Sequence, residues 1–166
     1  MEPLIEKLSV GGIKLSPELI QIHLLPDSAA AVNQVFRRLA DFRVNLTLVS
    51  LEATAGPLTG VFTISAEDRL SAESALQPFK GAFEMLSPVG ALTIFPHRSQ
   101  PALIGGLLSV LGAAGLPVYG LASSLSALTV TTDYRRLDQA VAAVCRLVDL
   151  PDNHAPFRPE FRVKQL

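Results

Sequence analysis

The amino-acid sequence predicts an α+β protein built from two βαββαβ modules, each with an antiparallel sheet and helices on one face. Two observations lead to this prediction. Segments with apolar residues at every second position alternate with segments in which apolar residues recur every three or four positions. The same order of segments recurs about 70 residues later, which indicates duplication of a whole small domain. A chain of 166 residues can bury such cores without disulfides or metals.

The first module begins with a strand predicted over Ile13–Leu25, where Gln21 and His23 alternate with apolar residues and His23 is expected to face solvent. A Pro-Asp-Ser turn follows, and apolar residues at three- and four-residue steps predict a helix over Ala29–Phe42. Two strands and a second helix complete the series: Val44–Glu52, Val61–Ser65 and Ser71–Phe79.

The second module repeats this order as strand, helix, strand, strand and helix, over Ala91–Phe95, Pro101–Ala114, Leu116–Ala122, Ser126–Thr132 and Leu137–Leu147. Single residues match as well. Leu39-Ala40 and Val44-Asn45-Leu46 align without a gap with Leu111-Gly112 and Leu116-Pro117-Val118. Two copies of this order predict two ferredoxin-like modules.

The domain boundaries follow from the repeat: a first module over 1–88, a second over 89–150, and a proline-rich tail over 151–166 that is a candidate edge strand. The first module lacks a clear final strand. Either Gly81–Met85 or Phe161–Leu166 closes its sheet, and the sequence pattern leaves both alternatives open.

Composition excludes several classes of function. Fourteen basic residues against 15 acidic ones give a formal charge of -1. The chain therefore lacks the excess of positive charge that is typical of proteins that bind nucleic acid or an anionic membrane. No apolar stretch reaches the ~20 residues of a membrane span, and acids stand where a signal peptide is basic, so a cytoplasmic protein is expected. No nucleophile motif, phosphate loop or carboxylate pair appears, which predicts a non-catalytic protein without cofactor or metal.

Apolar residues make up 49% of the chain, a surplus that is typical of a protein with an interface. The helix predicted over Pro101–Ala114 has Ser109 as its one polar residue, so we expect both of its faces to be covered. These features predict a homodimer. Cys145, the single cysteine, lies in an apolar helix without a histidine partner and is expected to be an inert thiol.

With the repeat established, the chain resembles the tandem ACT-domain regulatory region of aspartate kinases, without the kinase domain, over nearly all of its length. The matching segments are Ser123–Asp133 with the helix Leu137–Val144, Leu24-Leu25-Pro26-Asp27, Val44-Asn45-Leu46 and Val10-Gly11-Gly12-Ile13. The resemblance implies allosteric regulation through an amino acid. It places the ligand at the loop between the first strand and first helix and at the start of the second strand, across a dimer interface.

In the first module this resemblance points to a helix start and a strand start, at Asp27, Ser28, Ala29, Ala30, Ala31, Asn45 and Leu46. Amides at a helix start favour a carboxylate, and the Asp27 carboxylate and the Asn45 amide favour an ammonium group. Plain N-capping by Asp27 and Ser28, and a turn hydrogen bond by Asn45, are the structural alternatives.

In the second module the corresponding candidates are His97, Arg98, Ser99, Gln100 and Tyr119. Arg98 can pair with a carboxylate, but Pro117 stands where the first module has an amide side chain, so an ammonium group has no partner. A solvated Arg98 and a half-buried strand tyrosine at Tyr119 are the alternatives. We therefore expect the ligand in the first module.

Two functions follow from the sequence. The first is a non-catalytic regulatory module that binds an amino acid or a similar small metabolite across a dimer interface. The alternative is a protein-interaction or regulatory subunit of an amino-acid-biosynthesis enzyme whose own ligand site has decayed.

Overall fold

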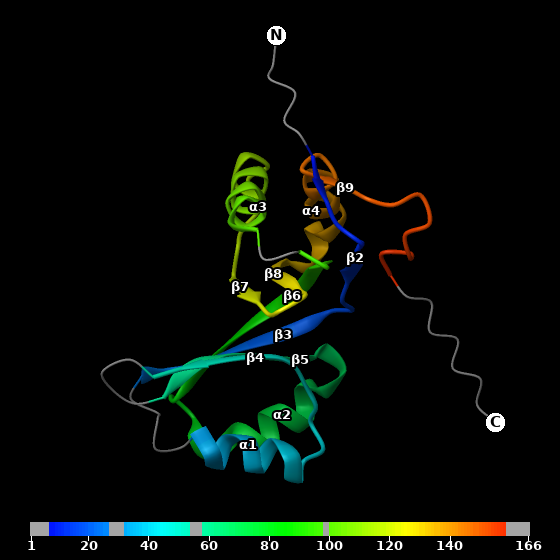
Figure 1. Ribbon diagram of the computed structural model, residues 1–166. Coiled ribbons are helices and arrows are strands. Elements are labelled where there is room, and N and C mark those ends of the chain that lie inside the picture. The colour runs from blue at the N-terminus through cyan, green and yellow to red at the C-terminus, as the bar shows by residue number, and fades with distance from the viewer. Residues whose placement is uncertain (1–6, 27–31, 54–57, 98–99, 159–166) are drawn as a thin grey trace, which may run out of the picture. The chain divides into compact units, whose positions relative to one another are not determined.

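The computed structural model describes residues 7–26, 32–53, 58–97 and 100–158 (Figure 1). The chain divides into two compact units. One, which we call the inserted unit, is Pro17–Val89. The other, the flanking unit, combines Met1–Ser16 with Gly90–Leu166. Both units combine α-helices with mainly antiparallel strands, which confirms the predicted α+β class.

The inserted unit runs β-α-β-β-α-β along the chain, through β3 (Leu19–Leu24), α1 (Val32–Asp41), β4 (Leu46–Glu52), β5 (Thr59–Ser65), α2 (Arg69–Leu76) and the first part of β6 (Phe83–Phe95). Its strands lie in the order β4-β5-β3-β6, and each neighbouring pair is antiparallel. In Figure 1, α1 and α2 lie side by side on one face of this sheet. Strand β4 therefore forms one edge.

One apolar core holds the inserted unit together. Strand residues Ile22, Phe62 and Ile64 pack with Leu39 of α1 and Leu76 of α2, and all five are almost completely buried. Burial of such side chains contributes roughly 1.5–3 kcal/mol each. The helices are also joined by a hydrogen bond, because Arg38 donates from Nε to the Ala75 carbonyl at 2.7 Å.

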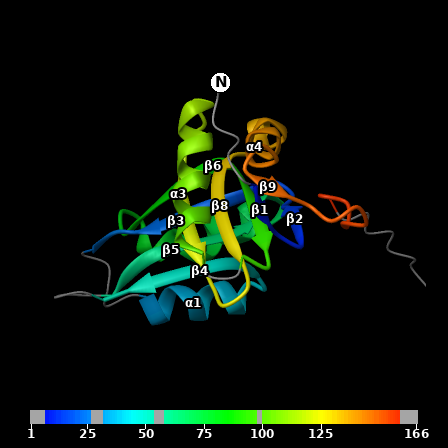
Figure 2. The ribbon, with the colours of Figure 1, turned by 45° about the horizontal axis from the view of Figure 1, so that its top comes forward.

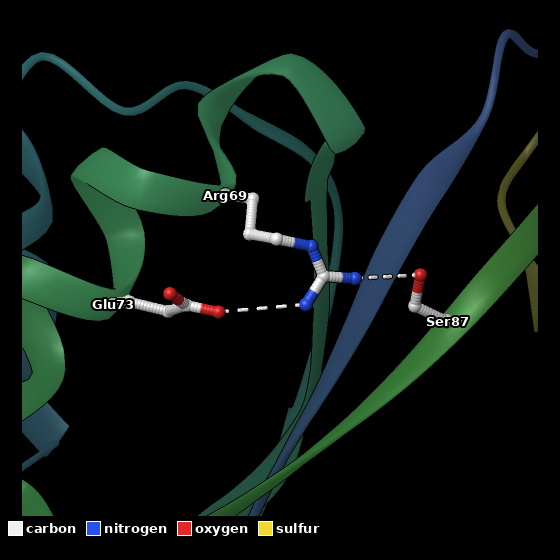
Figure 3. A network of polar contacts seen from close by, with 3 residues as sticks. All are labelled: Arg69, Glu73 and Ser87. Atoms are coloured by element: carbon white, nitrogen blue, oxygen red, sulfur yellow. Dashed lines mark hydrogen bonds and ion pairs between the residues drawn. The ribbon is translucent and has the colours of Figure 1, made fainter.

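A polar contact attaches α2 to β6 (Figure 3). The Arg69 guanidinium donates to Ser87 Oγ at 2.8 Å and lies 3.4 Å from a Glu73 carboxylate oxygen, one helical turn along α2. The ion pair is half exposed, so it contributes little by itself, well under about 1 kcal/mol. Its effect is to orient Arg69 toward the strand.

The flanking unit takes elements from both sides of the insertion. Its strands are β1 (Leu8–Ser9), β2 (Gly12–Leu15), the end of β6, β7 (Gly120–Ser123), β8 (Leu128–Asp133) and β9 (Val148–Asp149), and its α-helices are α3 (Pro101–Ala113) and α4 (Leu137–Val144). The order of the larger sheet in this unit is β2-β6-β8-β7. β1 pairs in parallel with β9, and Figure 2 shows β1 and β2 beside β9. Side chains from β2, β6, β8, α3 and α4 form its core.

The N-terminal segment corrects two predictions. The strand expected over Ile13–Leu25 is two strands, because the chain turns at Ser16-Pro17 and the strands on either side belong to different units. Residues 1–16 therefore do not group with the first module. Ser16 holds the end of β2 on β6, donating from its backbone N–H to the Ala91 carbonyl at 2.9 Å and accepting from the Ala91 N–H at 2.8 Å.

The first sheet is closed by β6, whose residues from Phe83 onward pair with β3, so the alternative at Gly81–Met85 holds in part. Phe161–Leu166 lies outside the described residues. His23 is half-buried rather than solvent-facing, because its ring nitrogen and the Gln21 amide are hydrogen-bonded at 2.9 Å. That bond gives both side chains a polar partner at a partly buried position.

Two helix ends support the internal repeat. After α1, the Val44 N–H donates to the Leu39 carbonyl, and Arg43 has a φ of 57°. After α3, Leu116 donates to Leu111 in the same way, and Gly115 has a φ of 62°. Both ends are Schellman motifs with one left-handed residue, at positions that the sequence alignment equates.

These two ends predict opposite stability effects. Arg43→Gly should raise the free energy of unfolding by about 1 kcal/mol, because a side chain at positive φ is strained. Gly115→Ala should lower the free energy of unfolding by about 1 kcal/mol, because alanine is strained at this positive φ. A Cβ there would contact nothing within 4 Å, so no steric clash adds to that loss. Urea denaturation measures both changes. Equal signs would show that the two helix ends are not equivalent.

Candidate ligand-binding site

The start of β4 presents the first candidate side chains. The Schellman motif turns the chain into β4 through buried Val44, and the next residues, Asn45 and Leu46, are exposed. A β-bulge follows, where Thr63 Oγ1 accepts from the Leu48 N–H at 3.1 Å. The Asn45 amide is therefore open to solvent at one end of an edge strand, where it can both donate and accept.

The end of β3 leads to the other half of the predicted site. Asp27, Ser28, Ala29, Ala30 and Ala31 lie outside the described residues. Just before them the strand end is fixed, because the Leu24 carbonyl accepts from Thr59 Oγ1 at 2.8 Å and Leu25 donates to the Ala82 carbonyl at 3.0 Å.

Strand register places Asn45 and the end of β3 at opposite ends of the sheet. Leu24 lies across from Gly60, which pairs with Leu51 near the end of β4. Leu46 pairs instead with Ile64, near the start of β3. Asn45 is thus separated from the end of β3 by roughly 20 Å, six residues of strand. Because residues 27–31 lie outside the described residues, the expectation that one loop and one strand start hold both halves of a zwitterion stays a prediction.

Both units carry exposed apolar residues on an edge strand, a feature that the sequence reasoning missed. In the inserted unit Leu46 is 36% and Val49 49% exposed on β4. Continuing the repeat alignment, Val118 and Leu121 occupy the same positions at β7 and are 39% and 36% exposed. Exposed apolar side chains on an unpaired strand edge are a surface for pairing with another chain.

The second group of candidates is built differently. His97 is buried, its Nε2 is hydrogen-bonded to the Ser124 carbonyl at 2.8 Å, and its backbone N–H donates to the Ser126 carbonyl at 3.3 Å. The imidazole thus ties the loop before α3 to the β7–β8 hairpin. Gln100 precedes α3 without a side-chain cap bond, and Arg98 and Ser99 lie outside the described residues.

Tyr119 is not beside His97 along the sheet. It is half-buried before β7, and its N–H donates to the Thr131 carbonyl at 2.8 Å, whereas His97 binds the hairpin after the end of β7. Pro117 is held nearby by Thr132, whose Oγ1 donates to the Pro117 carbonyl at 2.6 Å. His97 and Tyr119 therefore lie at opposite ends of β7.

Arg136 has a structural role that the sequence did not indicate. Its guanidinium donates to the Gly115 carbonyl at 2.7 Å and to the Ala114 carbonyl at 3.3 Å, just after α3. A cation there stabilises the negative end of the helix dipole and satisfies the last carbonyls.

Cys145 follows α4 and is partly buried against the core of the flanking unit. Burial raises the pKa of its thiol, and the positive charge of Lys7 offsets part of that rise. A raised pKa leaves less thiolate at a given pH, so the native protein should react with a thiol reagent at pH ~8 at least about tenfold more slowly than the unfolded chain. Equal rates would contradict an inert thiol.

No group of three or more metal-ligating side chains occurs in the part of the chain that the structure describes. Within the same residues, no helix is long and apolar enough to cross a membrane.

No family model and no curated protein matches the sequence. Solved structures do match. The regulatory subunit of aspartate kinase from Thermus flavus is 19% identical, with a TM-score of 0.72 over 84% of this chain and 98% of that one. The ligand-free regulatory subunit from Thermus thermophilus is 20% identical, with a TM-score of 0.72 over 85% of this chain and 100% of that one.

A longer enzyme also matches. Aspartokinase III from E. coli, in complex with lysine and aspartate, is 13% identical, with a TM-score of 0.63 over 90% of this chain and 35% of that one. These likenesses confirm, at the level of the fold, the resemblance to the regulatory region of aspartate kinases.

Proposed function

We propose that this chain is a non-catalytic, cytoplasmic regulatory module of two ACT-type ferredoxin-like units, which binds an amino acid between two copies of itself. The fold likeness to regulatory subunits supports a regulatory role. The observation that carries the proposal is the distance within one chain between the exposed Asn45 and the end of β3. In the proposed assembly a second copy brings the two together.

Antiparallel pairing of β4 edges about a twofold axis gives this arrangement. Such pairing places the Leu46 end of one β4 beside the Glu52 end of the other. The Glu52 end is the one at which β3 finishes and from which the segment 27–31 continues. Asn45 of one copy thereby approaches the helix-start loop of the other.

The charges at that junction suit an amino acid. Amides at the start of a helix favour the ligand carboxylate, while the Asn45 amide oxygen and the Asp27 carboxylate favour its ammonium group. Two equivalent sites result, because the twofold axis repeats the junction at the other end of β4.

A second candidate function is a regulatory or protein-interaction subunit of an amino-acid-biosynthesis enzyme whose own ligand site has decayed. One observation favours it in the flanking unit: the His97 imidazole is engaged by Ser124 in a buried structural bond. Leu125, at the tip of that hairpin, is 97% exposed and presents an apolar contact for another protein.

A thermal-shift screen of the twenty amino acids separates the two functions. A ligand at a hundred times its dissociation constant adds about 2.7 kcal/mol to stability, which is readily measured. Asn45→Ala should then abolish binding in titration calorimetry with little change in unfolding temperature, because the side chain is exposed. Arg98→Ala is the matched control and should leave affinity unchanged. No stabilising amino acid, or the reverse order of effects, would overturn the proposed site.

A further inference from the structure

The sheet of the flanking unit has two edges, β2 and β7, and the β2 edge is hydrogen-bonded to the segment that follows β9. At the β7 edge Leu121 is exposed. At the β2 edge the chain covers itself, because the Leu15 N–H donates to the Phe157 carbonyl at 2.8 Å. Figures 1 and 2 both show the orange segment after β9 on the side of β2.

Besides the hydrogen bond to Leu15, side-chain contacts hold that covering segment, residues 150–158. Phe157 packs against the core of the flanking unit and stacks on His154, with ring centroids 5.1 Å apart. Arg158 lies 3.0 Å from an Asp138 carboxylate oxygen on α4, and both side chains are more than half exposed. Leu150 adds an apolar contact. The ion pair is exposed and therefore weak, and the apolar side chains Phe157 and Leu150 are only partly buried.

Lys14 adds a second obstacle at the same edge. Its side chain is exposed on β2, with the ammonium 5.1 Å from the centroid of the Phe95 ring. If β2 strands of two copies paired antiparallel through the outward-facing backbone of Ile13 and Leu15, the two Lys14 side chains would lie directly opposite each other. Like charges in that arrangement oppose pairing.

We propose that residues 150–158 form a detachable cover which, together with Lys14, keeps the β2 edge from pairing with β2 of a second copy. The cover occupies the Leu15 amide, and Lys14 repels its own counterpart. Assembly of this unit through strand pairing is thereby restricted to the β7 edge. This restriction does not depend on ligand binding.

Amide hydrogen exchange and sedimentation of the full chain test the proposal. In the open variant, Phe157→Ser with Arg158→Glu, exchange at Leu15 should be at least tenfold faster than in the unchanged protein. The Ser16 amide, which donates to Ala91 on the other side of β2, should be unaffected. Adding Lys14→Thr should then produce species larger than the unchanged protein forms at the same concentration.

A charge swap, Asp138→Arg with Arg158→Asp, is the control and should keep both the slow exchange at Leu15 and the original mass. Unaltered exchange at Leu15 in the open variant would show that the segment is not a cover. Fast exchange with an unchanged mass in the variant that also carries Lys14→Thr would show that the uncovered edge does not pair. Either result overturns the proposal.

Discussion

Replacing Val49 by lysine should convert the protein to a monomer and abolish amino-acid binding. Val49 is the central residue of the exposed edge strand β4 and is 49% exposed. In an antiparallel β4–β4 pair the two copies of this residue face each other, so the substitution sets two positive charges side by side. Self-association should weaken at least about a hundredfold, since opposed like charges across an interface cost several kcal/mol.

Sedimentation velocity and titration calorimetry measure the two effects of Val49→Lys. The matched control is Leu121→Lys, at the equivalent position of β7, which should leave ligand affinity unchanged. The free energy of unfolding of the Val49→Lys monomer should be nearly the same as that of a single unchanged subunit, because the side chain is already half exposed. A monomer that still binds the ligand would show that the site is complete within one chain.

Replacing Leu107 by alanine should lower the free energy of unfolding by about 2–5 kcal/mol. Leu107 of α3 is completely buried in the core of the flanking unit. Truncation removes its transfer free energy and leaves a cavity that close-packed neighbours fill only in part. A loss of this size is a large fraction of the stability of a small protein.

The adjacent residue supplies the control. Leu108 lies on the outer face of α3 and is 44% exposed, so Leu108→Ala should change stability by less than about 1 kcal/mol. Urea denaturation of both variants at a concentration below that of self-association isolates the contribution of the single chain. Equal losses at both positions would show that the outer face of α3 is buried as deeply as the inner one.

The elements of the fold are predictable from local sequence, whereas their pairing is not. Apolar spacing predicts α3 almost to its ends, because Leu103, Leu107 and Leu111 recur at helical steps. Alternation cannot reveal that Ile13 and Ile20 belong to different compact units, since both lie in one alternating stretch. Partners far along the chain decide that question, and a local pattern carries no information about them.

The candidate site shows the same limit. Residue chemistry identifies Asn45 as an amide at a strand start, and the structure adds that this residue is exposed just before β4. The register between β3, β5 and β4 sets its distance from the end of β3, and no single segment encodes that register. His97 has the residue type of a ligand-binding side chain, but its burial against Ser124 is visible only once the hairpin has folded back.

The placement of the N-terminal strands also sets an order of folding. During synthesis β2 leaves the ribosome before all of the inserted unit, yet its partners on β6, Leu92 to Phe95, appear only after that unit is complete. The partner of β1 is made later still, because Leu8 pairs with Val148 of β9. Domains fold as their residues emerge, so Pro17–Val89 can reach its native pairing while the first strands of the chain remain without partners. β1 and β2 are therefore made before the inserted unit but complete their pairing after it.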